Sequence, residues 1–421
     1  ITMKNQLLAG LDIGSTEIRL VIGQLVQVEN GEKLQIVGAV SAPAEGISKG
    51  TINSIEDATS SISACLEKAE RLLGVSVNSV WLGINGLNLK CDRSRGVVAV
   101  SRSDNEISQD DVNRAIEAAQ ALSVPPNYEI LHVVPMEYKV DNQQAVKNPM
   151  GMTGVRLEVE TLVIQSLSNQ IKNMAKAIER ANLNIDDLVF SGLATASAVL
   201  DNKQKELGVA MVNIGATTTT LVVYEEGELL HSAVLPVGSG LITADIAIGL
   251  RCPITLAERI KVKYGSAKSE QFNKKDEIDI TDLLREEDLH DEISVISRKY
   301  VAEIIEARVE EILLRLDGEF KKINRSGMLP AGVVLVGGGA KLVDLVEVAK
   351  KVLRLPVSMG ANKTVPTVVD KVNEQDYLTA LGLVVWGEQF RRGQSNPGIS
   401  LGSMSGSLAR SAKKLWSIFR P

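Results

Sequence analysis

Two stretches of the chain, about half its length apart, share one pattern of apolar and polar positions. Residues 209–214 are almost all apolar, which is typical of a buried strand, and they run into a Gly/Ala/Thr turn at 215–220. A β-rich stretch follows and ends at the turn residues 225–227. Residues 10–22 repeat the order of strand, turn and strand. The repetition predicts two similar halves that face each other.

The two turns are rich in groups that bind anions. Their matching positions are Asp12 and Asn213, Gly14 and Gly215, Thr16 and Thr217, and Leu20 and Leu221. Backbone amides converge in turns of this kind, and hydroxyl groups add further donors. One such turn alone is also typical of an ordinary hairpin, but two of them predict one polyphosphate held between the turns. The residues expected to contact phosphate are Gly14, Ser15, Thr16, Gly215, Ala216, Thr217 and Thr218.

Hydrophobic periodicity predicts most of the remaining first half. Apolar residues at helical spacing predict a helix over 55–73, stopped by Gly74, and a buried strand follows at 77–84. Residues 85–165 interrupt this order and are expected to form an inserted α/β subdomain. Its expected elements are a strand at 96–101, a helix at 108–122, and strands at 130–140 and 155–166.

The second half is expected to repeat the plan of the first. Its expected elements are a strand at 229–237, helices at 241–250, 255–264 and 294–316, a strand at 333–336, and helices at 341–353 and 375–390. Residues 265–291 are highly charged, which predicts an exposed excursion from the fold. A Gly/Ser/Asn-rich stretch at 391–407 is expected to be a flexible linker.

Composition and charge narrow the class of protein. Aromatic residues make up 3% of the 421 residues, so the core is expected to consist of Val, Ile, Leu and Ala. The three cysteines lie far apart without metal-ligand spacing, which favours a reducing cytoplasm. Six basic residues and no acid follow Glu388, so the preceding chain has 40 basic (46 less six) against 52 acidic residues. An acidic body argues against nucleic-acid binding, and a basic tail indicates an anionic partner.

The basic tail ends in a segment, 408–419, whose apolar residues fall on one helical face. A short tethered helix with a Trp/Phe face and a basic flank is typical of binding to an anionic membrane surface. One such helix binds weakly, so firm attachment would need several copies. Docking on a protein groove and a disordered tail are the alternatives. The residues expected to bind the membrane are Arg410, Lys413, Lys414, Leu415, Trp416, Ile418 and Phe419.

Two further features lie at the ends of predicted strands. Asp12 follows a buried strand, where a carboxylate can hold Mg²⁺ directly or through water, with an Asx-type turn as the alternative. The glycines Gly337, Gly338 and Gly339 follow the strand at 333–336. They suit amide contacts to phosphate or a flat space for a base.

Glu258 and Lys261 lie at i, i+3 on one helix face, where they suit ribose hydroxyls or a solvated ion pair. Together with the two turns and the glycines, this pair resembles the site of the actin, Hsp70 and sugar-kinase superfamily. The resemblance implies an α/β, actin-like two-lobed ATPase fold with two repeated sheet-and-helix halves and ATP in the cleft. It assigns ribose to the acid–base pair and adenosine to Gly337–Gly339.

A closer resemblance covers residues 8–386. Its most specific stretches, 131–135, 148–158 and 237–247, resemble the FtsA family of actin-like bacterial cell-division proteins, as does the tethered tail. The resemblance implies subdomain 1A at 4–84, 166–205 and 365–390, an inserted subdomain 1C at 85–165, 2A at 206–237 and 305–364, 2B at 238–304, a linker at 391–407 and a membrane-targeting helix at 408–421.

The same resemblance implies partners. Head-to-tail filaments of the chain are expected on the cytoplasmic face of the cell membrane at the division site, together with other division proteins. The C-terminal peptide of the tubulin-like FtsZ is expected to dock on residues 238–304. Arg298 and Lys299 are candidates to contact that acidic peptide.

Several positions depart from the superfamily pattern. Glu17 stands where a lysine is common near the phosphates, and its carboxylate would repel phosphate if it faced the cleft. Asn213 and Thr220 stand where the second turn commonly carries acids, and Ser191-Gly192 replaces a common Glu-Pro pair. ATP binding with slow or absent hydrolysis is therefore expected.

Three other functions stay open. An Hsp70-like ATPase would need a folded substrate domain after the last expected helix, where only about 31 residues remain. A small-molecule kinase would need a catalytic aspartate in a substrate cleft, and none is evident. A pilus-assembly adaptor of the PilM type shares the inserted subdomain but as a rule lacks the amphipathic tail.

Overall fold

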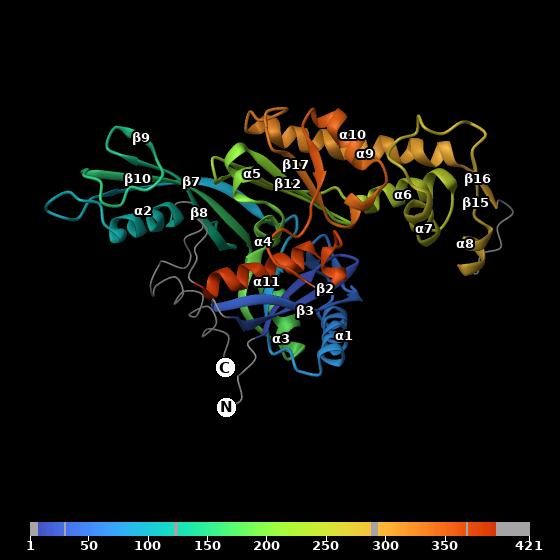
Figure 1. Cartoon of the computed structure of the whole chain (residues 1–421), viewed down its shortest axis with the longest axis horizontal. Helices are drawn as coiled ribbons and strands as arrows, with labels where there is room; N and C mark the ends of the chain where they lie inside the picture. Colours follow the sequence, from blue (N-terminus) through green and yellow to red (C-terminus); the bar gives the residue numbers. More distant parts are fainter. Residues whose placement is uncertain (1–6, 29–30, 122–124, 288–293, 368, 393–421) are drawn as a thin grey trace.

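Two five-stranded sheets of matching topology form the centres of the two halves (Figure 1). The computed structural model describes residues 7–28, 31–121, 125–287, 294–367 and 369–392. The first sheet contains β1 (Leu7–Ile13), β2 (Glu17–Val28), β3 (Gly31–Pro43), β6 (Ser79–Ile84) and β11 (Asn184–Phe190). The second contains β12 (Val209–Ile214), β13 (Thr219–Glu225), β14 (Glu228–Leu235), β17 (Gly332–Val336) and β18 (Val357–Met359).

Each sheet is built in the same way. Three strands joined as an antiparallel meander continue, on the side of the first strand, into two parallel strands. The orders are β3-β2-β1-β6-β11 and β14-β13-β12-β17-β18. The predicted repeat of two similar halves is therefore confirmed, and the strand predicted over 209–214 has the same bounds as β12.

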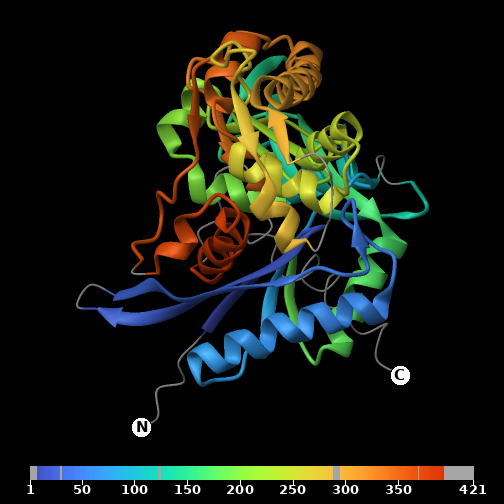
Figure 2. The same ribbon diagram turned by 90° about the vertical axis from the view of Figure 1, so that its right-hand side faces the viewer.

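Helices cover both faces of the first sheet. They are α1 (Ile55–Leu73), α3 (Ser168–Arg180), α4 (Ser191–Val199) and α11 (Leu378–Arg391). α1 and α3 pack on one face, while α11 covers the other and α4 contacts strands of both sheets (Figures 1 and 2). The predicted bounds of α1 are confirmed, because Ser54 caps its first turn and Gly74, with φ of 69°, ends it.

α4 and α11 form the packed layer between the halves. Their backbones approach closely at Gly382, where a Cβ would lie 2.1 Å from the carbonyl oxygen of Ala194. Apolar residues of both sheets join these helices in one core, including Val189 of the first sheet and Met211 and Val222 of the second. The two halves are therefore held together by a continuous apolar interface.

The inserted subdomain is a four-stranded antiparallel sheet with one helix across it, at one end of the molecule (Figure 1). Its elements are β7 (Lys90–Ala99), α2 (Gln109–Ala121), β8 (Tyr128–Val140), β9 (Gln143–Val146) and β10 (Arg156–Leu167). β7 begins earlier than the expected strand at 96–101, because its first six residues are exposed or half-buried and show no apolar alternation. β9 was not expected.

Further helices and short strands complete the two halves. They are β4 (Ile47–Ser48), β5 (Thr51–Ile52), α5 (Asn202–Leu207), α6 (Ser239–Leu250), α7 (Ile254–Tyr264), β15 (Glu277–Asp279), α8 (Thr281–Glu286), β16 (Val295–Ser297), α9 (Arg298–Lys322), α10 (Leu345–Leu353), and the 3₁₀ helices η1 (Gly338–Lys341) and η2 (Asp370–Asn373).

The predicted exposed excursion over 265–291 is wrong for the part that the structure describes. β15 pairs with β16, and α8 follows β15 directly. The apolar residues buried in β15, in α8 and between them are Ile278, Ile280, Leu283 and Leu284. They stand singly or in pairs among charged residues, so the sequence shows no apolar run although each of them turns inward.

Two helix predictions also need correction. The long helix expected from residue 294 begins at Arg298, because the preceding residues pair as β16. The helix expected over 341–353 is shorter, since Asp344 adopts a left-handed φ of 64° and separates η1 from α10.

The tail lies outside the described residues, which end at 392. The linker from residue 393 onward, the segment 408–421 and all seven membrane-binding candidates therefore stay predictions. In the described part of the chain no single helix is long and apolar enough to cross a membrane. Only α6 and α7 taken together, with a bend of 109°, meet that test.

Candidate functional site

The two repeated turns lie against each other between the two halves. In each turn the glycine amide donates to the carbonyl three residues further on, at 3.1 Å for Gly14 and 2.9 Å for Gly215. The hydroxyls of Ser15 and Thr217 are 2.8 Å apart and share a hydrogen bond. Strand ends about 200 residues apart in sequence thus bring two glycine turns and their hydroxyls to one place.

The N-terminus of α6 supports the second turn. The amides of Ser239 and Gly240 donate to the carbonyls of Gly215 at 2.9 Å and Ala216 at 2.8 Å. A Cβ on Gly238 would lie 2.6 Å from the Ala216 carbonyl oxygen, so this approach requires glycine. The second turn is therefore held by the backbone of a neighbouring helix.

The turn formed by Gly337, Gly338 and Gly339 lies directly against the end of β12. Gly337 has φ of 89°, and a Cβ there would lie 2.2 Å from Asn213 Oδ1. A Cβ on Gly339 would lie 2.6 Å from the side chain of Ile214. Gly338 has nothing within 4 Å of its Cβ position, so this turn is open on one side. The structure thus brings the three glycines to the second of the two repeated turns.

Glu258 and Lys261 belong to the same site and are more than a solvated ion pair. Lys261 Nζ lies 2.6 Å from Glu258 Oε2 and 2.8 Å from the hydroxyl of Thr243, which itself bonds Glu258. Thr243 lies one turn after Ser239 on α6, and Lys261 is only 11% exposed. Sequence reasoning missed Thr243, although its spacing of four residues from Ser239 places both on one face of the helix.

Asp12 stands at the end of β1, next to the first turn. Burial raises the pKa of Asp12 to about 6, and the nearby guanidinium of Arg19 opposes part of this rise. Among the described residues no group of three or more His, Cys, Asp or Glu side chains is placed to hold a metal. A single carboxylate still suits Mg²⁺, which commonly takes one or two carboxylates together with waters and substrate phosphates.

Glu17 faces a cation that sequence reasoning missed. Arg19 Nη2 lies 2.6 Å from Glu17 Oε2 and 3.3 Å from Asp376 Oδ2. Arg19 pairs with Asp12 in the register of β1 and β2, so both side chains lie on one face of the sheet. The negative charge expected from Glu17 is therefore offset locally. The i, i+2 spacing of Glu17 and Arg19 on a strand was the available signal.

The two positions without the common acids make hydrogen bonds between the halves. Asn213 Nδ2 donates to the hydroxyl of Thr379 at 3.0 Å, and this hydroxyl also bonds Thr195 at 3.0 Å. Thr220 donates to Asn85 Oδ1 at 3.0 Å. Thr195 lies on α4 and Thr379 on α11, and Asn85 directly follows β6, so these partners belong to the first half. We call these two contacts the neutral clasps.

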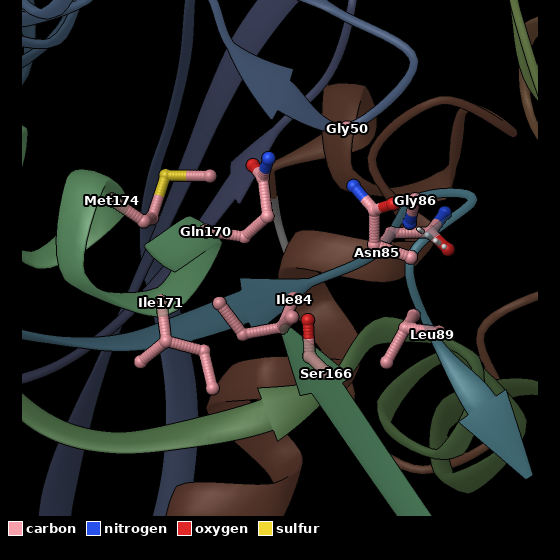
Figure 3. Close-up of a pocket in the computed structure, with 10 residues that line it drawn as sticks. Gly50, Ile84, Asn85, Gly86, Leu89, Ser166, Gln170, Ile171 and Met174 are labelled. Atoms are coloured by element: carbon pink, nitrogen blue, oxygen red, sulfur yellow. Dashed lines mark hydrogen bonds between the residues drawn. The ribbon is translucent and has the colours of Figure 1, made fainter. Parts of the chain in front are cut away.

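A pocket beside the second of these clasps lies where the inserted subdomain joins the first half (Figure 3). It is small and is lined by uncharged residues, among them Ile84, Asn85, Ser166, Gln170 and Met174. A lining without positive charge does not suit a polyphosphate. The cleft between the turns is therefore the better candidate site.

Arg298 and Lys299 lie apart from the cleft, at the start of α9. The guanidinium of Arg298 stacks over the ring of Phe272 at 4.5 Å, and its amide donates to the carbonyl of Asp276 at 2.9 Å. Arg298 is exposed and Lys299 is half-buried. This placement leaves their role toward a partner as a prediction.

Two sequence families match parts of the chain. The family described as "SHS2 domain inserted in FTSA" matches residues 86–165, and the family described as "Cell division protein FtsA" matches residues 210–382. The first match coincides with the inserted subdomain, and the second covers most of the second half together with the start of α11.

Curated relatives extend the similarity over most of the chain. The cell division protein FtsA of Pseudomonas aeruginosa is 33% identical over 402 residues, which cover 96% of this chain and 93% of the relative. The FtsA of Neisseria meningitidis is 35% identical over 376 residues, covering 89% and 88%. The FtsA of Bacillus subtilis is 34% identical over 380 residues, covering 90% and 83%.

Solved structures show the same fold at low sequence identity. The PilM–PilN type IV pilus biogenesis complex aligns with a TM-score of 0.65 and 16% identity, covering 90% of this chain and 98% of the other. MreB5 of Spiroplasma citri bound to ADP aligns with a TM-score of 0.54 and 10% identity, covering 92% and 98%. The expected actin-like, two-lobed α/β fold with an insertion in its first half is confirmed.

Proposed function

The chain belongs to the FtsA family of cell division proteins, and from this premise we propose that it is an ATP-binding, filament-forming adaptor of bacterial division. In this proposal it polymerises head to tail on the cytoplasmic face of the membrane, tethers FtsZ filaments there and recruits later division proteins. The observation that carries the nucleotide part is the contact between the two glycine turns, with Gly337–Gly339 beside them.

Each part of the cleft has a role in this proposal. The two turns hold the phosphates through amides and hydroxyls, and Asp12 positions Mg²⁺ at the phosphates. Glu258 and Lys261, held by Thr243, contact the ribose. The open side of Gly338 leaves room for the adenine. When bound, the magnesium ion would supply charge neutralisation for the phosphate oxygens.

Hydrolysis is slow or absent in this proposal. General-base activation of water needs a carboxylate or another base beside the phosphates. At the two positions where the superfamily commonly carries acids, Asn213 and Thr220 are neutral and already bonded to the first half. Steady-state ATP turnover by the purified chain tests this, and a rate like that of a sugar kinase would contradict it.

Membrane attachment is assigned to the tail, and FtsZ binding to residues 238–304. A basic helix with Leu415, Trp416 and Phe419 on one face suits an anionic lipid surface, and filaments would supply the several copies that weak binding needs. Arg298 and Lys299 are the proposed contacts of an acidic peptide. The division into subdomains 1A, 1C, 2A and 2B belongs to the same proposal.

Co-sedimentation with anionic liposomes in the presence of ATP tests the membrane part. The full chain is expected to pellet, and a truncation after Arg392 is expected to stay in solution. Leu415→Glu should abolish pelleting because it places a charge on the apolar face. Ser417→Glu, which makes the same charge change off that face, should retain most of it. Equal pelleting of the full chain and the truncation would contradict the proposal.

A pilus-assembly adaptor of the PilM type is the second candidate, because a PilM structure shares the fold over most of the chain. It predicts that the full chain and the truncation both stay soluble at low salt. A peptide partner would then be sought by binding measurements. An Hsp70-like ATPase would instead show nucleotide turnover stimulated by peptide.

A further inference from the structure

Arg19 lies beside the first turn, on the strand that follows it. Its Nη1 atom is 3.9 Å from the position that a Cβ on Gly14 would occupy, and its side chain is only 13% exposed. A guanidinium offers five N–H donors in one plane, which matches the geometry of phosphate oxygens. A largely buried arginine next to the turn at Gly14 is therefore well placed to bind a phosphate group.

The donors of Arg19 are incompletely used. Nη2 contacts the carboxylates of Glu17 and Asp376, at 2.6 Å and 3.3 Å. Nε is buried and has no hydrogen-bond partner in the part of the chain that the structure describes. Leaving a buried donor without an acceptor is unfavourable, so this arrangement has room for a further acceptor.

Asp376 can release Arg19 without losing its only cation. Its Oδ1 atom lies 2.5 Å from Nζ of Lys341. Lys341 is the last residue of η1, which contains Gly338 and Gly339. Glu17 is 43% exposed, so water can solvate its carboxylate when the arginine moves. The exchange of Arg19 from these carboxylates to a ligand therefore leaves no buried charge unpaired.

We propose that Arg19 binds the polyphosphate of the nucleotide and that Asp376 and Glu17 compete with this ligand for its guanidinium. The inference rests on the proposed ATP site and adds a residue and its regulation to it. Arg19 supplies the cation that position 17 lacks. The Arg19–Asp376 contact that is exchanged lies within the first half, whereas the contact of Asp376 with Lys341, which joins the two halves, is retained.

Isothermal titration calorimetry on the full chain, with Mg²⁺ and with ATP, ADP or adenosine as ligand, tests this. Arg19→Ala is expected to weaken ATP and ADP binding about 10- to 100-fold, since charge-assisted hydrogen bonds are lost, and to leave adenosine binding unchanged. Asp376→Asn is expected to strengthen ATP binding about two- to tenfold, because one competitor of the phosphate loses its charge. Arg71→Ala, which removes an exposed positive charge on α1, is the control and should change neither.

Each outcome separates the inference from the proposed function. A wild-type chain that binds neither ATP nor ADP would overturn both. A wild-type chain that binds ATP, with Arg19→Ala binding it equally well, would overturn the inference alone. Equal losses for adenosine and ATP, or weaker ATP binding by Asp376→Asn, would show that Arg19 and Asp376 only maintain the fold. If Arg19→Ala does not fold, Asp376→Asn and Glu17→Gln still decide the question, since both must tighten ATP binding.

Discussion

The first and second turns have the same backbone arrangement and opposite chemistry. The first is flanked by charged side chains, Asp12, Glu17 and Arg19, which suit a metal ion and phosphate. At the second, the matching strand positions are the neutral Asn213 and Thr220, whose hydrogen bonds reach the first half. The repeated fold therefore places amides and glycines at matching positions in both turns, while the side chains of the two turns differ in charge and in their contacts. In the proposed function both turns bind phosphate through their amides, the charged side chains of the first turn add contacts to the ligand, and the neutral side chains of the second join the halves.

The neutral clasps explain why the second turn tolerates the loss of its acids. A carboxylate at either position would be partly or fully buried, and among the described residues the side-chain hydrogen bonds of Asn213 and Thr220 are made to uncharged groups. Asn213 and Thr220 satisfy the same polar neighbours without charge. These hydrogen bonds join the two halves, and in the proposed function the absence of a carboxylate at both positions keeps hydrolysis slow.

The largest effect is expected from removing the charge of the first turn. Asp12→Asn should weaken binding of ATP in the presence of Mg²⁺ about 10- to 100-fold, because the carboxylate that positions the ion is lost. Calorimetry with and without EDTA measures this. Asn213→Ala, at the matching position of the second turn, should retain the full dependence on Mg²⁺. An Mg²⁺ dependence that survives in Asp12→Asn would contradict this role.

Introducing carboxylates at the second turn should make it chemically more like the first and raise the rate of ATP turnover. The double variant Asn213→Asp with Thr220→Asp is expected to raise steady-state ATP turnover about tenfold or more, since a base near the phosphates becomes available. Release of inorganic phosphate measures the rate, and each single variant serves as a control. Unchanged turnover with intact ATP binding would show that missing acids are not the limiting feature.

A smaller effect is expected on the stability of contact between the halves. Asn213→Ala and Thr379→Val should each lower the free energy of unfolding by about 1 kcal/mol, because a hydrogen bond between the halves is lost. Urea denaturation of both single variants and the double variant gives the coupling energy. A coupling of about 0.5 kcal/mol or more is expected, whereas strict additivity would mean that the two groups do not interact.

The smallest effect at neutral pH concerns the inserted subdomain, which only the first half contains. Burial alone would raise the pKa of Asp111, but hydrogen bonds from Ser108 and Ser101 outweigh it and hold the pKa below its usual range. Because the folded pKa is depressed, the stabilising contribution is fully present above about pH 4 and is lost as the pH falls further. Thermal unfolding between pH 7 and pH 3 should therefore show a drop that Asp111→Asn lacks. A variant with the same acid drop as the wild type would contradict this.

Local sequence signals predicted much of the frame of this fold. The strand at 209–214 and the helix at 55–73 were predicted with their observed bounds, because an apolar run and a glycine C-cap are properties of adjacent residues. The charged stretch 265–291 was mispredicted, since its few apolar residues are buried only through contact with α7 and α9. The pattern of apolar residues within a short stretch of sequence does not show contacts with helices that lie elsewhere in the chain.

The cleft shows most clearly which features the sequence predicts and which contacts only the folded structure shows. The glycine turns, their repetition and the i, i+3 pair were readable along the chain, since each is defined by a few neighbouring residues. The contact of Arg19 with Asp376, 357 residues apart, and that of Asn213 with Thr379, 166 apart, were not. Such pairs depend on how α11 packs between the sheets, and that packing is set by apolar contacts from both halves at once. Repetition along the chain therefore specified two turns that meet. Only the folded structure placed a cation beside the first turn and the two neutral clasps beside the second.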